Sequence, residues 1–340
     1  MTQGCCHKES VLVVVLAETR AYEHTFNLFK KNLLDIVNAD LCLCVANNPR
    51  EVTDNPFYNE AKYIWTYDEP DDWGDAFDRA QEKYSCHQNW RQLLLIKDQW
   101  LGGVKGDDEH PGSAGILLFF RWFLKESILN SGVLQKYDRF VITRSDFIHC
   151  IPHVPLKFLS REHIWIPNGE DYGGYTDRHI VVSREHVLDV LSISDRLITE
   201  PDHLFSEMSF YSKWNVEKYI KFSFTRLGLV ERIRRFPYTM YSVRSIGGHS
   251  RWSEGKFSSK FGYYIKYQSE YRSYILASLF VKEKASWSPK KIMLLNALQG
   301  LGVFCYKVFD KFKDKTRAIR HPLRFYQQKD SLGKTDESKI

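Results

Sequence analysis

Two groups of polar side chains in the sequence have the residue types and spacing of a ligand site. The first is Arg144-Ser145-Asp146, which directly follows the short apolar segment 140–143. A cation and a carboxylate two positions apart at the carboxyl end of a strand lie where α/β folds bind ligands. Asp146 has the chemistry of a ligand for Mn²⁺ or Mg²⁺, and Arg144 can contact a phosphate or hold the carboxylate. The alternative is an ordinary Arg–Asp pair at the surface.

The second group is the loop 168–178, which combines three glycines with acidic, basic and aromatic residues. Glycine permits tight turns and a close approach of the backbone to a ligand. Carboxylates and tyrosines supply hydrogen-bond partners and stacking faces for a hydroxyl-rich molecule such as a nucleotide sugar. A polar loop that fixes its own conformation is the alternative. The candidate side chains are Glu170, Asp171, Tyr172, Asp177 and Arg178.

Apolar runs around these polar groups predict an α/β protein with a mostly parallel central sheet flanked by helices. The segment 11–16 is continuously apolar and rich in β-branched residues, which is typical of a strand buried on both faces. Strand and helix patterns then alternate, as in a doubly wound fold. We predict strands at 11–16, 40–46, 63–65, 140–143, 164–167 and 180–182. We predict helices at 22–37, 90–101, 116–129, 184–193 and 202–222.

The composition is that of a globular protein and restricts its partners. The chain has 340 residues, of which 43% are hydrophobic and 26% charged, and its net charge is +6. A basic surface can meet phosphates, anionic lipid or nucleic acid. Because the sequence contains no nucleic-acid-binding motif, we predict no nucleic-acid partner. The seven cysteines fit no zinc template, and no signal peptide is recognisable, so we predict a cytoplasmic protein.

We predict three segments along the chain: an α/β domain at 8–245, a helical and irregular extension at 246–325, and a disordered tail at 326–340. Within the extension, residues 289–313 combine apolar side chains with lysines. This pattern is typical of a helix on an anionic membrane surface, which would make the protein peripheral at a membrane. Packing of the same helix on the α/β domain is the open alternative.

The segment around Arg144 resembles the metal-binding segment of glycosyltransferases with the GT-A fold. The pattern Y-D-x-x-h-x-x-R-S-D-F is similar to their D-x-D segment, with Arg144 at the first acidic position. The opening strand, followed by Glu18-Thr19-Arg20, strengthens the likeness. The resemblance covers about residues 10–215 and is greatest to small enzymes of bacteria and large DNA viruses.

The resemblance implies a GT-A-like fold, a UDP- or GDP-sugar donor, and a divalent cation, Mn²⁺ or Mg²⁺. By this likeness Asp146 is the metal ligand, and Arg20 meets the nucleotide or the diphosphate. Because Arg144 replaces an acid, Asp146 is the carboxylate that the motif leaves for the metal. The implied donor-binding residues are Arg20, Arg144, Ser145, Asp146, Tyr172 and Arg178.

Transfer of the sugar by direct displacement requires a carboxylate that accepts the proton of the acceptor hydroxyl. Asp177 resembles the acidic residue of a G-x-x-D-R-type loop in these transferases and is the favoured candidate, as the base or as a sugar-binding residue, with Asp171 and Glu170 as rivals. Glu207 is a further candidate, because an acidic residue near this position faces the acceptor in the related transferases. Its alternative role is electrostatic, since acids are favourable near the start of a helix.

These predictions describe an inverting, metal-assisted glycosyltransferase, a hexosyl- or pentosyltransferase. The acceptor would be a hydroxyl of a glycan or of a lipid-linked molecule. A nucleotidyltransferase is one alternative, but it calls for a glycine-rich phosphate loop where this chain has Glu18-Thr19-Arg20. A non-catalytic carbohydrate-binding protein is the other alternative.

Overall fold

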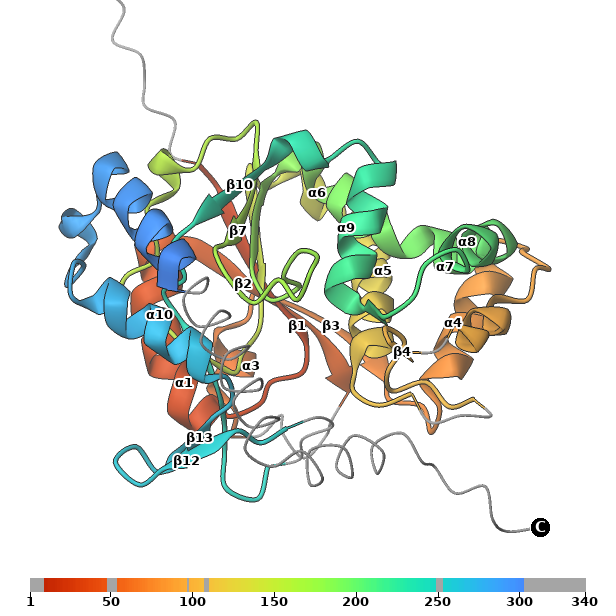
Figure 1. Cartoon of the computed structure of the whole chain (residues 1–340), viewed down its shortest axis with the longest axis horizontal. Helices are drawn as coiled ribbons and strands as arrows, with labels where there is room; N and C mark the ends of the chain where they lie inside the picture. Colours follow the sequence, from red (N-terminus) through yellow and green to blue (C-terminus); the bar gives the residue numbers. More distant parts are fainter. Residues whose placement is uncertain (1–8, 48–53, 97, 107–109, 249–252, 303–340) are drawn as a thin grey trace, which may run out of the picture.

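Seven strands form a central, mostly parallel sheet in the order β10-β7-β8-β5-β1-β2-β3 (Figure 1). Of these strands, β8 runs antiparallel to both of its neighbours, β5 and β7. The strands are β1 (Val11–Ala17), β2 (Ala39–Asn47), β3 (Tyr63–Asp68), β5 (Arg139–Thr143), β7 (Ile164–Pro167), β8 (Ile180–Ser183) and β10 (Ile233–Phe236). The computed structural model describes residues 9–47, 54–96, 98–106, 110–248 and 253–302.

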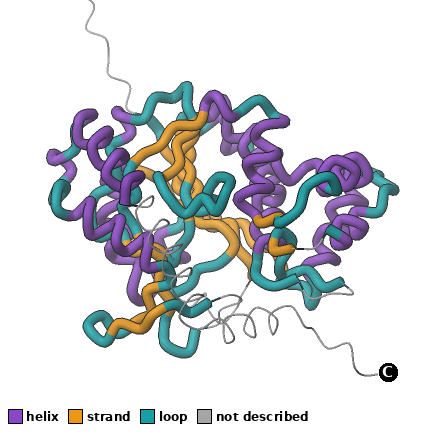
Figure 2. The backbone as a smooth tube through the Cα atoms, viewed as in Figure 1, coloured by secondary structure: helices purple, strands orange, loops and turns teal. Residues whose placement is uncertain are grey.

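Helices cover both faces of this sheet (Figure 2). The side chains of β1 alternate between two cores: Leu12 and Val14 pack on the side of α5, whereas Val13 and Val15 pack on the side of α1. Burial on both faces explains why the strand is apolar throughout. The helices are α1 (Tyr22–Phe29), α2 (Asp35–Val37), α3 (Pro56–Glu60), α4 (Trp73–Lys83), α5 (Ala114–Ser131), α6 (Arg184–Leu191), α7 (Asp195–Thr199), α8 (Pro201–Met208), α9 (Val216–Arg226) and α10 (Gln268–Ser278).

A second sheet of four strands begins where β5 ends. Its order is β12-β13-β11-β6, and its pairs are antiparallel. The first residue of β6 directly follows Asp146. The segment Arg144-Ser145-Asp146 therefore connects β5 of the central sheet to β6 of the second sheet. Residues from far along the chain are thereby brought to the carboxyl end of β5. The strands are β6 (Phe147–Ile148), β11 (Tyr241–Arg244), β12 (Lys256–Ser258) and β13 (Tyr263–Ile265).

The predicted strands and the long helix at 116–129 are confirmed, but two predicted helices are wrong in part. The segment 90–101 forms a 3₁₀ turn at Trp90–Leu95 and then β4 (Asp98–Gln99). The segment 202–222 divides into α8 and α9, separated by β9 (Trp214–Asn215). β4 and β9 pair with each other, a contact between distant segments that local spacing cannot predict.

The described part of the predicted extension packs on the α/β domain. Ala277 of α10, and Ile292 and Leu295 of the helical segment 289–302, belong to the core that also contains α1. Figure 1 shows α10 beside α1. Met293, Leu294 and Leu301 in the same segment are exposed, which leaves apolar side chains available for contact with a membrane. This contact stays a prediction. Residues 303–340, including the predicted tail, lie outside the described residues.

None of the helices in the described ranges is long and apolar enough to cross a membrane.

Candidate functional site

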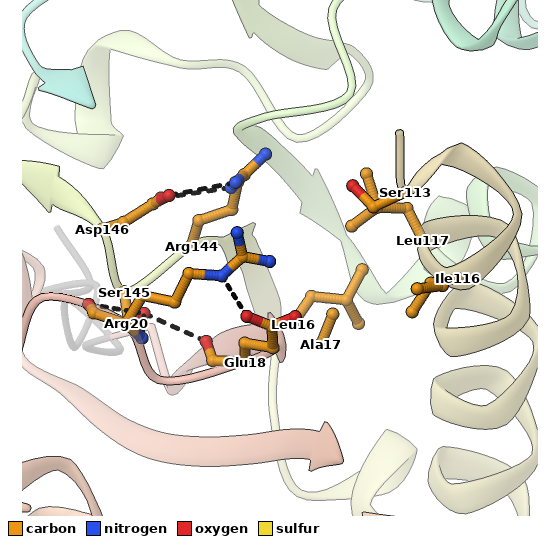
Figure 3. A pocket seen from close by; sticks show the side chains of 10 residues that line it. All are labelled: Leu16, Ala17, Glu18, Arg20, Ser113, Ile116, Leu117, Arg144, Ser145 and Asp146. Atoms are coloured by element: carbon orange, nitrogen blue, oxygen red, sulfur yellow. Dashed lines mark hydrogen bonds and ion pairs between the residues drawn. The ribbon is translucent and has the colours of Figure 1, made fainter. Parts of the chain in front are cut away.

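The Arg144-Ser145-Asp146 segment lies at the carboxyl end of β5, beside the carboxyl end of β1. The strand order reverses here, because β2 flanks β1 on one side and β5 flanks it on the other. In open α/β sheets this reversal creates the crevice in which ligands bind. A small cleft occupies the position (Figure 3), lined by Leu16, Ala17, Glu18, Arg20, Arg144, Ser145 and Asp146, and by Ser113, Ile116 and Leu117 at the start of α5.

Ser145 joins the loop after β1 to the end of β5. The Arg20 backbone N–H donates to Ser145 Oγ at 2.8 Å, and this hydroxyl donates to the Glu18 carbonyl at 3.0 Å. Ala17 and Ala21 flank the loop with φ angles of 75° and 52°, a left-handed conformation that residues other than glycine rarely adopt. The loop is therefore held in a specific, strained conformation, a feature that clusters at functional sites.

Asp146 is almost fully buried and accepts hydrogen bonds from two arginines. Arg144 donates through Nε to Oδ1 at 3.1 Å and through Nη2 to Oδ2 at 3.0 Å. Arg244, the last residue of β11, donates to Oδ2 as well. Burial alone would raise the pKa of Asp146, but Arg144, Arg244, Arg20 and Lys266 outweigh it and hold that pKa well below its ordinary value. Asp146 is therefore a carboxylate at all physiological pH values.

Four basic side chains surround Asp146, and we call Arg20, Arg144, Arg244 and Lys266 the basic cluster. Lys266 follows β13 and is brought in by the second sheet. Burial, together with the positive charges of Arg144 and Arg244, lowers its pKa to about 6. Two carboxylates, Asp146 and Glu18, offset part of this charge, and Glu18 pairs with Arg20. With a pKa of about 6, Lys266 is largely uncharged at neutral pH, so the excess of positive charge comes from the three arginines. This excess favours an anionic ligand.

The side chains around Asp146 do not fit a divalent cation. Both carboxylate oxygens already accept hydrogen bonds from guanidinium groups, and the nearest charged groups are cations. Mg²⁺ and Mn²⁺ instead prefer a set of oxygen ligands. In the described part of the chain, no three His, Cys, Asp or Glu side chains gather as a metal site would require. The prediction that Asp146 binds Mn²⁺ or Mg²⁺ stays a prediction.

The loop 168–178 is anchored to the second sheet and to α10 through Arg178. This guanidinium pairs with Glu270 at 2.5 Å and with Glu170 at 3.3 Å, and it lies 4.2 Å from the centre of the Tyr267 ring. Glu270 also accepts hydrogen bonds from the hydroxyl of Tyr238 and from Ser242. Arg178 thus has partners on several sides, and its predicted contact with the donor would compete with them.

Asp171 and Tyr172 also stabilise the loop. Asp171 Oδ1 accepts from Arg235 at 2.8 Å and from the Thr176 backbone N–H at 3.2 Å. Tyr172 is 48% exposed and donates its hydroxyl hydrogen to Glu170. An exposed aromatic ring at this position remains available for stacking on a ligand, as the sequence predicts.

Asp177, the favoured catalytic carboxylate, lies within electrostatic reach of the basic cluster. It is 9% exposed and helps to raise the pKa of Arg144, an effect that burial of this arginine opposes. A second carboxyl, Glu217 in the first turn of α9, lies near it and is 7% exposed. Burial and the charge of Asp177 raise the pKa of Glu217 to about 7. The two carboxyls therefore form an acidic pair with one member that changes charge near neutral pH.

Glu207 is not among the residues that line the cleft. It lies on α8, which packs against α7, and it pairs with Arg196 at 3.1 Å and with Arg226 at 3.3 Å. These ion pairs link α8 to α7 and α9. The structure thus brings Arg20, Arg144, Ser145, Asp146 and Asp177 into one region and places Glu207 in another.

Three residues of the region are not predicted from the sequence: Arg244, Lys266 and Glu217. Arg244 reaches the site through the pairing of β11 with β6, which joins residues more than about 90 positions apart. Lys266 reaches it through the pairing of β11 with β13, which joins residues about 20 positions apart. Glu217 stands in the segment 202–222, which the sequence predicts as one helix. Asn215, followed two positions later by an acidic residue, is a sequence signal for the start of a new helix. In the structure Asn215 caps α9, because its side chain accepts a hydrogen bond from the Lys218 N–H at 2.8 Å.

The chain matches no known family model, and the comparison with curated proteins finds no similar sequence. The functional argument therefore depends on the residues and on their geometry.

Proposed function

We propose that the protein is a glycosyltransferase that moves a sugar from a nucleotide-diphosphate sugar to a hydroxyl of a glycan or lipid-linked acceptor. The observation that carries the proposal is the basic cluster built around Asp146 at the switch point of the sheet. A diphosphate is a multiply charged anion, and arginine forks match the geometry of its oxygens. UDP- and GDP-sugars carry such a group next to the sugar that is transferred.

The start of α5 supports the same assignment. Ser113 and Ile116 line the cleft opposite Arg20 and Arg144, and the side chains of these two arginines extend from the strand ends toward the helix (Figure 3). The amino end of a helix carries partial positive charge, which favours phosphate oxygens. The helix and the basic cluster would therefore act on the same anion.

The acidic pair, Asp177 and Glu217, supports the catalytic part of the proposal. In a direct displacement, the acceptor oxygen bonds to the anomeric carbon while the bond from that carbon to the diphosphate oxygen breaks. The electron pair leaves with the diphosphate, and a carboxylate takes the acceptor proton. A carboxyl with a pKa of about 7, as for Glu217, suits that role because it is a base strong enough to take the proton. Asp177 is the alternative base, and the basic cluster would stabilise the departing charge.

The seven-stranded, mostly parallel sheet is compatible with the GT-A fold that we propose. The segment corresponding to D-x-D would then be Arg144-Ser145-Asp146, between the two sheets. A lipid-linked acceptor would be consistent with the exposed apolar side chains of the segment 289–302, and a cytoplasmic, membrane-peripheral location remains part of the proposal.

A donor-hydrolysis assay with a panel of UDP- and GDP-sugars tests this function. We expect release of UDP or GDP from at least one donor, at a rate that rises when the right acceptor is added. The assay is run with Mn²⁺ and, separately, with EDTA. No turnover of any donor, together with no thermal shift with any nucleoside diphosphate, would overturn the proposal.

A further inference from the structure

Asp146 stands where the resemblance expects a metal ligand, yet its surroundings are those of an anion site. Arg144 donates one hydrogen bond to each oxygen of the Asp146 carboxylate, and Arg244 donates to Oδ2 from the second sheet. A carboxylate held by two arginines has no oxygen left that is free of a cationic partner. Its evident effect is to fix the positions of both guanidinium groups.

Arg244 has unused hydrogen-bonding capacity in this position. The side chain is 2% exposed, and its Nη1 donates to Asp146 and to the Val243 carbonyl. Its Nε and Nη2 are buried and make no hydrogen bond to any described residue. Buried donors without a partner are costly and uncommon in native proteins. Oxygens of a bound anion would supply the missing acceptors.

The charges of the cluster point the same way. The three guanidinium groups of Arg20, Arg144 and Arg244 outnumber the two carboxylates that they contact, Asp146 and Glu18, by one. Lys266 interacts electrostatically with Arg144, Arg244 and Asp146, and its Nζ lies 5.1 Å from the centre of the Tyr267 ring. Because its pKa is about 6, a bound anion would favour its protonated form. A divalent cation would add positive charge to a region that already has an excess, whereas a diphosphate would neutralise it.

We propose that the basic cluster binds the diphosphate of the donor directly, without a divalent cation, and that Asp146 positions Arg144 and Arg244 instead of binding a metal. This inference rests on the proposed function, because it names the means by which that site holds its substrate. The positive charge that a metal would bring to the leaving group is supplied by the guanidinium groups. Asp146 is in this account a positioning residue.

Binding of UDP, GDP and inorganic pyrophosphate to the full chain tests the inference. Calorimetric titrations are run in EDTA and again in an excess of Mn²⁺ or Mg²⁺. We expect the best of the three ligands to bind in EDTA with an affinity within about threefold of that with metal. A loss of tenfold or more in EDTA, restored by Mn²⁺ or Mg²⁺, would overturn the inference and leave the proposed function standing. No binding under either condition would overturn both.

Variants locate the binding and separate it from loss of folding. We expect Arg144→Gln and Arg244→Gln each to weaken binding in EDTA by about 10- to 100-fold, the range typical of charged hydrogen bonds. Arg161→Gln is the matched control, because Arg161 is a partly exposed arginine paired with Glu185 away from the cleft. Thermal melts of each variant confirm that it is folded. Unchanged binding in folded Arg144→Gln and Arg244→Gln would contradict the inference.

A double-mutant cycle tests the role of Asp146. If this residue acts by holding Arg144, then Asp146→Asn and Arg144→Gln together weaken binding by less than the product of their separate effects. The expected shortfall is at least fivefold. Independent effects that multiply would contradict the positioning role. Because the wild-type titration in EDTA is decisive alone, the inference stays testable even if the Asp146 variant fails to fold.

Discussion

Glu217 is the residue whose ionisation gives the acidic pair its proposed chemistry. Burial and Asp177 raise its pKa from 4.5 to about 7. Between these two pH values the folded protein keeps a proton that the unfolded chain has lost. The free energy of unfolding therefore falls as pH rises through this window, by roughly 1–3 kcal/mol.

Glu217→Gln should remove the contribution of this carboxyl to the fall in the free energy of unfolding, because a glutamine side chain does not ionise in this pH range. We predict that the variant is more stable than wild type at pH 7.5 and similar to it at pH 4.5. Urea unfolding of both proteins at the two pH values measures the difference, with the exposed Glu162→Gln as the control. If wild type and Glu217→Gln show the same change with pH, the perturbed carboxyl is not Glu217.

At the same scale, the sequence predicts where the candidate site lies but does not predict Arg244, Lys266 or Glu217 as members of it. Arg144-Ser145-Asp146 and Arg20 are predictable because each follows an apolar strand, and parallel strand ends meet at one edge of the sheet. Their roles are less predictable, because the type of residue does not reveal its partners. Asp146 alone has the chemistry of a metal ligand, and with Arg244 beside it the same carboxylate becomes the centre of an ion-pair network.

Among the elements, the contact between the loop 168–178 and the start of α9 positions the acidic pair. The Tyr175 N–H donates to the Glu217 carbonyl at 3.0 Å. Gly174 makes the approach possible, since a Cβ atom added there would lie 1.8 Å from the same carbonyl oxygen. Loop and helix therefore meet through their backbones, a contact that only glycine permits.

Gly174→Ala should push the loop away from α9 and separate Asp177 from Glu217. We predict a loss of stability of about 1–3 kcal/mol, as for overpacked sites, and a drop of at least tenfold in sugar transfer. Gly302→Ala is the matched control, because an added Cβ there meets no atom of the described residues within 4 Å apart from its own helix and chain neighbours. Chemical denaturation and the transfer assay measure the two effects. An alanine variant with wild-type stability and rate would show that this contact does not position the pair.

Some helices and strands can be predicted from the sequence more easily than others. β1 and β2 are predictable because burial on both faces leaves a continuous apolar run in the sequence. The sequence does not predict the second sheet, because β6, β12 and β13 are only two or three residues long and β6 depends on its pairing with the distant strand β11. This sheet is the element that completes the basic cluster, so the site could not be completed from local patterns.

In the molecule as a whole, a hydrophobic core lies on each side of the central sheet. One of these cores joins the α/β domain to the extension, which the sequence predicts as separate segments. The predicted extension contributes β12, β13 and α10 to the fold and supplies Lys266 and Glu270 to the site. Side chains from both sides of the boundary predicted at residue 245 therefore contribute to the candidate site. Composition and charge alone predict a globular, basic protein and leave this arrangement open.

A crystal structure of the protein with UDP or GDP tests the central claim most directly, with both nucleotides offered in competition. We predict that the diphosphate of the bound nucleotide lies at the carboxyl ends of β1 and β5, within hydrogen-bond distance of Arg144 and at least one other member of the basic cluster. A nucleotide bound elsewhere, or no nucleotide bound at saturating concentrations of both, would contradict the account.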